Sequence, residues 1–298
     1  MNLRQFFQRS LPETKHLYLL GWEAKFDGSQ QCYNFIATQA IDQSSVKEVD
    51  IALELIFKGD RLAEAYEYDE GIRQQRPLSK VELGLPYPKD VIIHSLYEIK
   101  RSYFYESYIG GKCPDHFSIP ALRLAAPFQY LGKIGQAEDA FSWLPFDLHL
   151  TAPIYLNIKG VFLDYTDPLA PVVHNAEALS AADHSLDDLL QPDTIVEFEQ
   201  TKISFEHYKK TDDDLLGSAG VPRWVQYPTI PTCPKSGKVM RFVCQLGSFG
   251  NIQTQYTNAD PAHEYYREIK DLNFWGDGDL FIFFEPESKM VYYLIQHT

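Results

Sequence analysis

Short apolar runs separated by turn dipeptides recur along this 298-residue chain, and they restrict its fold more than any other sequence feature. In the run ALELIFK, Leu53, Leu55 and Phe57 recur at every second position, as a strand with one buried face requires. Gly59-Asp60 separates this run from RLAEAYEY, and Asp27-Gly28 separates HLYLLGWEAKF from QQCYNFIATQAI. The N-terminal region, residues 1–90, is therefore predicted to be a β-meander, to which VELGL (81–85) adds a further candidate strand.

Three segments favour helices instead. DVIIHSLYEIKRSYFYES (90–107) carries apolar residues near helical spacing, among them Leu96, Ile99 and Tyr103. LSAADHSLDDLL (179–190) and DPAHEYYREIKDL (260–272) are shorter candidates, and Asp260 can cap the second of them. With the strands, these helices predict an α+β fold that is mostly antiparallel sheet, with a second region over residues 91–298.

Two stretches of this second region repeat one another. LGKIG (131–135) matches LGSFG (246–250), and a strand with an acidic-Pro turn follows each, at Asp167-Pro168 and at Glu285-Pro286. A glycine-proline element precedes each, at 108–114 and at 216–222, and the polar segment 174–193 is expected to connect the two. The shared order indicates an internal repeat over 105–175 and 215–298, although two unrelated β-segments would also produce such hairpins.

The C-terminal motifs resemble a known family. The residues GVPRWVQ (220–226), Cys233-Pro234, MRFVCQL (240–246) and Trp275-Gly276-Asp277 before LFIFF are similar to the YwqG-like proteins. These are bacterial proteins of unassigned function, and the programmed cell death protein 2 group of eukaryotes is distantly similar. The match covers 215–298 well and 105–175 weakly, and it does not extend to residues 1–90.

The resemblance implies a body dominated by antiparallel sheet, in which two related YwqG-like halves pack together. The eukaryotic relatives look like factors that escort a basic ribosomal protein. No catalytic residue of the family is established, so the resemblance assigns none here.

The turn at Cys233 departs from the eukaryotic pattern, which tends to have a CxxC pair. Here the turn reads Cys233-Pro234-Lys235-Ser236, and serine is a poor ligand for zinc, whose structural sites need four good ligands. Cys244 lies in an apolar strand, where a buried thiol is the ordinary interpretation. We therefore expect no metal at this turn.

Two further patterns could carry chemistry. Asp147-x-His149 in FDLHL places both side chains on one face of a strand, where His174, Asp164 or Asp115-His116 could join them as metal ligands; a solvated face is the simpler interpretation. Asp277-Gly278-Asp279 offers two carboxylates, but Ser288 occupies the closing position of an EF-hand pattern. A turn that enters a strand is the simpler interpretation there.

The net charge of the chain restricts the classes of partner that it could bind. The chain has 41 acidic against 27 basic side chains and a net charge of −14, which argues against nucleic acid and anionic membranes as partners. A basic protein is the easier partner for such a surface, although solubility alone is the simpler interpretation of the acid excess. No run approaches the roughly 20 apolar residues that span a bilayer. The four cysteines lack a framework spacing, which suits the cytoplasm.

Trp224 and Trp275 are the candidate binding residues, because each stands among polar loop residues. With Arg223, Gln226 and Asp277 they form the predicted partner-binding set, and core packing of each indole is the alternative. The leading hypothesis is a non-enzymatic, cytoplasmic protein-binding module of escort or immunity type, with no catalytic residue and no cofactor. The rivals are a metal-assisted hydrolase that uses Asp147, His149 or Asp277, and a small-molecule sensor.

Overall fold

The chain is built almost entirely from antiparallel strands. The computed structural model describes residues 13–20, 24–27, 32–35, 40–41, 51–59, 61–69, 72–76, 93–121, 127–156, 158, 160–176, 190–191, 193–208, 215–226, 229–248 and 251–297. They belong to two compact units, Met1–Ser95 and Leu96–Thr298. The α+β prediction is wrong, because the helices that lie wholly within the described residues are two short 3₁₀ segments, η5 (Asp139–Phe141) and η6 (Tyr266–Ile269).

The first unit contains a six-stranded sheet in the order β7-β6-β5-β1-β4-β8. The hairpin predicted around Gly59-Asp60 is confirmed, and Gly59 takes the positive φ of 61° that its turn requires. Separately, β2 pairs with β3 in antiparallel fashion, and the predicted Asp27-Gly28 turn extends beyond the described residues. The candidate strand at 81–85 lies outside the described residues. The strands of this unit are β1 (Thr14–Leu20), β2 (Ala24–Asp27), β3 (Cys32–Phe35), β4 (Ala40–Ile41), β5 (Ile51–Lys58), β6 (Arg61–Asp69), β7 (Ile72–Arg76) and β8 (Ile93–His94).

In the first unit, the alternate residues predicted to be buried on β5 do lie together in a core. Leu53, Leu55 and Phe57 are buried in one small core with Leu17 and Leu19 of β1. Glu54, which lies between Leu53 and Leu55, points to the opposite face of the sheet, as the two-residue period of a strand demands, and Ile56 is also buried.

A charged cluster occupies that opposite face. The Glu54 carboxylate accepts hydrogen bonds from Arg73 Nε at 2.7 Å and Tyr68 OH at 3.2 Å, and it lies 2.8 Å from His16 Nδ1. Burial works to raise the pKa of Glu54, but the bonds to Arg73 and His16 outweigh burial and lower it. Arg73 also lies 3.3 Å above the centre of the Tyr66 ring.

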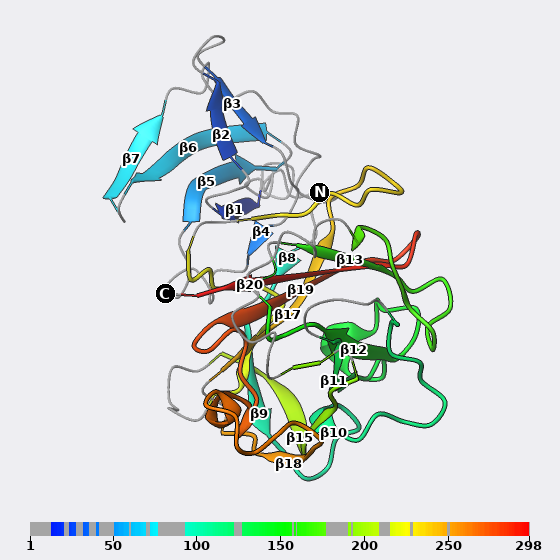
Figure 1. The fold of residues 1–298 in the computed structure, drawn as a ribbon. Helices are drawn as coiled ribbons and strands as arrows, with labels where there is room; N and C mark the ends of the chain where they lie inside the picture. The colour runs from blue at the N-terminus through cyan, green and yellow to red at the C-terminus, as the bar shows by residue number, and fades with distance from the viewer. Residues whose placement is uncertain are drawn as a thin grey trace, which may run out of the picture. The chain divides into compact units, whose positions relative to one another are not determined.

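The second unit is one large sheet with the strand order β12-β11-β10-β15-β9-β16-β17-β19-β20-β13-β14, and β18 pairs with β15 (Figure 1). Every pairing in it is antiparallel. Its strands are β9 (Tyr97–Arg101), β10 (Tyr108–Gly111), β11 (Gln129–Ile134), β12 (Leu148–Ala152), β13 (Val161–Asp164), β14 (Val172–Val173), β15 (Val196–His207), β16 (Gly217–Ala219), β17 (Arg241–Gly247), β18 (Thr254–Thr257), β19 (Asp279–Glu285) and β20 (Met290–Gln296).

The helix predicted over 90–107 is wrong, because its central residues form β9. This strand lies between β15 and β16, and Ile99 pairs with Phe205 on one side and Gly217 on the other. Leu96 and Ile99 are three residues apart, which is the spacing of one helix face. The same spacing arises here because Leu96 lies just before the strand and Ile99 lies within it. Pairing on both edges satisfies the backbone of β9 and decides in favour of the strand.

The other two helix predictions have different outcomes. Segment 260–272 contains only η6, although Asp260 does accept a hydrogen bond from the backbone of Ala262 at 2.9 Å. Most of segment 179–190 lies outside the described residues.

The two halves of the predicted repeat do not pack as separate bodies. Strand β10 pairs with β15, which precedes the second half, and β16 pairs with β9, which precedes the first half. The central β9–β15 pair then joins both halves in one continuous sheet. The expectation of two packed halves is therefore corrected, and the duplication itself stays a prediction.

The LG strands occupy matching places in this sheet, because β11 pairs with β10 and β17 pairs with β16, but the acidic-Pro hairpins do not, because β19 pairs with β17 while β13 pairs with β20. Both predicted acidic-Pro hairpins are confirmed, as β13–β14 and β19–β20. In the first LG motif, Gly132 has a φ of 125°, and a Cβ atom there would lie 2.1 Å from Tyr108 O. A side chain would prevent β10 and β11 from approaching so closely, which explains the glycine.

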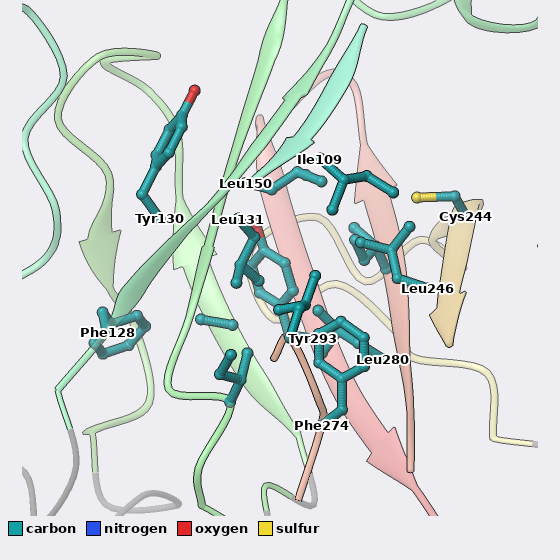
Figure 2. Packing of buried hydrophobic residues seen from close by; sticks show 14 of the residues in the cluster. Ile109, Phe128, Tyr130, Leu131, Leu150, Cys244, Leu246, Phe274, Leu280 and Tyr293 are labelled. Carbon is teal, nitrogen blue, oxygen red and sulfur yellow. The ribbon is translucent and has the colours of Figure 1, made fainter. Parts of the chain in front are cut away.

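Two apolar clusters cover the two faces of β17, β19 and β20. Leu280, Ile282 and Phe284 belong to the larger core of the unit, while Phe281 and Phe283 belong to a smaller cluster with Met240. Figure 2 shows the larger core, in which Leu131, Leu150 and Tyr293 gather beside Leu246. Both faces of these strands are thus buried, and polar side chains among them need internal partners.

Candidate functional site

The predicted binding loop, residues 221–226, runs over the end of the sheet formed by β17, β19 and β20. Two buried glutamines hold its backbone. Gln245 Oε1 accepts a hydrogen bond from Arg223 N at 2.9 Å. Gln296 Oε1 accepts from Val225 N at 3.2 Å and from Gln226 N at 3.1 Å. Because these bonds fix the backbone, the loop presents Arg223 and Gln226 at the surface in a defined orientation.

Trp224 of the same loop packs inward. Its ring stacks on Phe281 with centroids 4.9 Å apart and an interplanar angle of 11°, and on Phe283 at 6.0 Å. The indole therefore closes the smaller apolar cluster and fastens the loop to the sheet.

Beneath the loop runs a row of polar side chains on one face of the sheet, which we call the polar row: Glu98, Ser218, Gln245, Asp279 and Gln296. Register places Glu98 opposite Ser218, and Ser218 opposite Gln245. Gln245 Nε2 donates a hydrogen bond to Asp279, which pairs with Gln296 in register. The polar row thus links β9 to β20 across five strands.

The two carboxylates of the polar row differ in their surroundings. Burial raises the pKa of Asp279, against the hydrogen bond from Gln245 and the charge of Arg223, and Asp277 raises it further. Glu98 is 2% exposed, and its Oε2 lies 3.0 Å from Lys100 Nζ. The sequence reading missed Glu98 because the residue fell within the predicted helix.

Trp275 and Asp277 lie apart from this loop. Trp275 has a φ of 55°, donates its backbone N–H to Ile154 O at 3.0 Å, and packs against the larger core. Asp277 is exposed, and its charge acts on Asp279. The structure therefore brings Arg223, Trp224 and Gln226 together in one loop. The charges of Arg223 and Asp277 both act on Asp279, whereas Trp275 packs against the larger core.

The turn at Cys233 faces the turn of the β19–β20 hairpin. Cys233 Sγ lies 3.1 Å from Ser288 Oγ, and Ser288 Oγ donates to Glu285. Burial works to raise the pKa of the Cys233 thiol, but hydrogen bonds from Ser236, Ser288 and two backbone N–H groups lower it. Hydrogen bonds between the side chains thus join the two turns.

The FDLHL segment is buried where the simpler interpretation expected a solvated face. A hydrogen bond of 2.8 Å joins His149 Nδ1 to Tyr130 OH, which is 2.9 Å from Tyr108 OH. Phe117 stacks on the imidazole with centroids 4.9 Å apart, and the His116 ring lies 5.8 Å away. Burial, with His116 and Lys133 beside it, lowers the pKa of His149 to about 4, so this imidazole is neutral at pH 7.

The proposed partners of His149 are engaged elsewhere. Asp147 forms an ion pair with Lys133 at 3.0 Å, and Asp164 pairs with Lys235. Of the predicted ligand set, only His116 lies against His149. No group of three or more His, Cys, Asp or Glu side chains that could hold a metal occurs in the described part of the chain.

The sequence reading also missed an exposed aromatic loop between β9 and β10. Tyr103, Phe104 and Tyr105 are 87%, 92% and 45% exposed. Three consecutive aromatic residues are the only signal in the sequence, and they were assigned to a helix.

Comparison with known proteins adds no relative: no protein-family model, curated protein or solved structure matches the chain. No helix among the described residues is long and apolar enough to cross a bilayer.

Proposed function

We propose that this protein is a non-enzymatic, cytoplasmic module that binds a basic protein partner, in the manner of an escort or immunity protein. The observation that carries the proposal is a set of exposed carboxylates with no ion pair among the described residues. They include Glu106, Asp115, Asp139, Glu199, Asp260 and Glu264. Membership of the YwqG-like family is part of the same proposal.

Unpaired carboxylates act at longer range than paired ones. An ion pair cancels most of its own field, whereas an isolated carboxylate attracts cations over about 8–10 Å at physiological ionic strength. The net charge of −14 adds a general attraction for a basic partner, which speeds the encounter. Arg223, Gln226 and Asp277, on or beside the fixed loop, would contribute directional hydrogen bonds to such a partner.

The test compares two triple variants that carry the same change in net charge. Glu106→Gln/Asp139→Asn/Glu199→Gln neutralises unpaired carboxylates, while Glu206→Gln/Glu268→Gln/Glu287→Gln neutralises carboxylates that have ion pairs. Binding of a twelve-residue peptide of alternating lysine and glycine is measured by fluorescence anisotropy at 50 and 300 mM NaCl.

We expect wild-type protein to bind this peptide at 50 mM NaCl, and to bind it much more weakly at 300 mM. The unpaired triple variant should lose about tenfold in affinity, and the paired variant much less. Equal losses in the two variants, or no difference between the lysine peptide and a matched glutamate peptide, would contradict the proposal.

A further inference from the structure

The aromatic loop, residues Ser102–Ser107, exposes more apolar surface in one place than any other short segment of the described chain. Tyr103 and Phe104 are almost fully exposed, and Tyr105 is half-exposed next to them. Single exposed apolar residues are ordinary, but contiguous aromatic surface on a folded domain marks a place of interaction. Aromatic residues also dominate binding hot spots.

Hydrogen bonds hold both ends of this loop on the sheet. Ser102 N donates to Lys202 O at 2.8 Å, and Ser107 O accepts from Ile203 N at 3.0 Å. Ser107 Oγ accepts from Gly135 N and donates to Glu138 Oε1, both at 3.0 Å. The rings are therefore displayed from a fixed base, and a partner would not have to order that base on binding.

Carboxylates surround the C-terminal end of the loop. Glu106 is part of it, and the charges of Asp139 and Glu106 both act on Glu138. At the other end, Arg101 donates to Thr201 and to Asn251 O, while Lys202 is exposed. Three acidic groups thus lie at the C-terminal end of the loop, and two basic groups lie at the base of the other end.

We propose that the aromatic loop binds an arginine-rich segment of the basic partner, an inference that rests on the proposed function. A guanidinium group stacks flat on an aromatic ring and still donates hydrogen bonds in its plane to a carboxylate. A lysine ammonium group has no flat face to stack. Exposed rings in a loop whose C-terminal end carries Glu106, with Glu138 and Asp139 next to that end, therefore favour arginine over lysine at equal charge.

The test uses two twelve-residue peptides of equal charge, alternating arginine with glycine and lysine with glycine. Fluorescence anisotropy at 50 mM NaCl compares their binding to wild-type protein and to Tyr103→Ser/Phe104→Ser/Tyr105→Ser. Val172→Ser serves as the matched control, because Val172 is an apolar residue of β14 with 63% exposure. Circular dichroism and thermal unfolding confirm that each variant is folded.

We expect wild-type protein and Val172→Ser to bind the arginine peptide at least about fivefold more tightly than the lysine peptide. The triple variant should lose this preference and keep the weaker, salt-dependent binding that both peptides share. Loss of the preference alone, with lysine-peptide binding retained, supports the aromatic loop as the arginine site.

Three results would overturn the inference. If both peptides bind wild-type protein equally, or the triple variant keeps the preference, the basic-partner function stands without this loop. If neither peptide binds, the proposed function itself fails. If the loop instead binds a bilayer, wild-type protein but not the triple variant will sediment with phosphatidylcholine vesicles. If it binds a second copy of the chain, wild-type protein but not the triple variant will dimerise in analytical ultracentrifugation.

Discussion

At the scale of single residues, buried polar groups take their properties from a few neighbours. His149 is neutral because burial and the nearby His116 and Lys133 disfavour its charged form. The pKa of the Cys233 thiol is lowered because its hydrogen bonds outweigh the effect of burial. Sequence reading named both residues as candidates, but it could not supply the neighbours that determine their chemistry.

His149 predicts how stability depends on pH. Its pKa is about 4 in the folded protein and near the ordinary histidine value of about 6.5 when unfolded, so the unfolded state binds the proton more readily. Stability should therefore fall as pH drops from about 6.5 towards 4, by on the order of 2 kcal/mol for this residue. Urea unfolding at pH 7 and pH 4.5 measures the loss.

The comparison is His149→Gln, which removes the titrating group and retains hydrogen-bonding capacity. This variant should be less stable than wild type at pH 7 and should lose less stability between pH 7 and pH 4.5. Identical pH profiles for the two proteins would show that His149 is not the group responsible.

Gly132 predicts the cost of a single Cβ atom. Gly132→Ala should destabilise the protein by about 3 kcal/mol, because the new atom would clash with Tyr108 O and φ is 125°. Gly237→Ala is the control: its φ is 69°, nothing lies within 4 Å of the added atom, and a cost of about 1 kcal/mol is expected. Chemical denaturation of both variants tests the difference, and equal costs would mean that backbone conformation alone matters.

At the scale of elements, strand pairing and side-chain hydrogen bonds decide the conformation of each segment. Residues 97–101 form a strand because β15 and β16 pair with both of their edges. The loop 221–226 is ordered because Gln245 and Gln296 accept its backbone N–H groups and Trp224 stacks on Phe281.

The loop 221–226 predicts a change in proteolysis. Gln296→Leu removes the acceptor for Val225 N and Gln226 N and leaves both donors without it, so the loop should open more often. Trypsin should then cleave after Arg223 at least about tenfold faster than in wild type, measured by mass spectrometry. Gln226→Ala removes only the exposed hydrogen bond of 2.8 Å from Gln226 Nε2 to His297 O, so it should raise the rate much less; a similar acceleration there would contradict the assigned role of Gln296.

At the scale of the whole molecule, the chain has separate apolar cores in its two units. Among the residues that the structure describes, the core around Leu53 and Leu55 draws on the first unit alone, and the largest core draws on residues beyond Ser95 alone. A small core buries less apolar surface, so the first unit should be the less stable of the two.

Two leucine substitutions test this division. Leu55→Ala and Leu280→Ala each remove a fully buried side chain and should each cost about 2–5 kcal/mol within their own unit. Scanning calorimetry should show two transitions, the lower shifted by Leu55→Ala alone and the upper by Leu280→Ala alone. One transition that both substitutions shift would mean that the units unfold together.

The sequence alone determined the local features of this protein. Alternation identified the buried face of β5 and turn dipeptides located the hairpins, because each of these depends on residues that are neighbours in the chain. Only the tertiary structure decided that β9 is a central strand, that both halves share one sheet, and that Glu98 and His149 are buried while Tyr103 and Phe104 are exposed. Those outcomes depend on which distant segments pair, and the free energy of such pairing comes from contacts that no local pattern specifies.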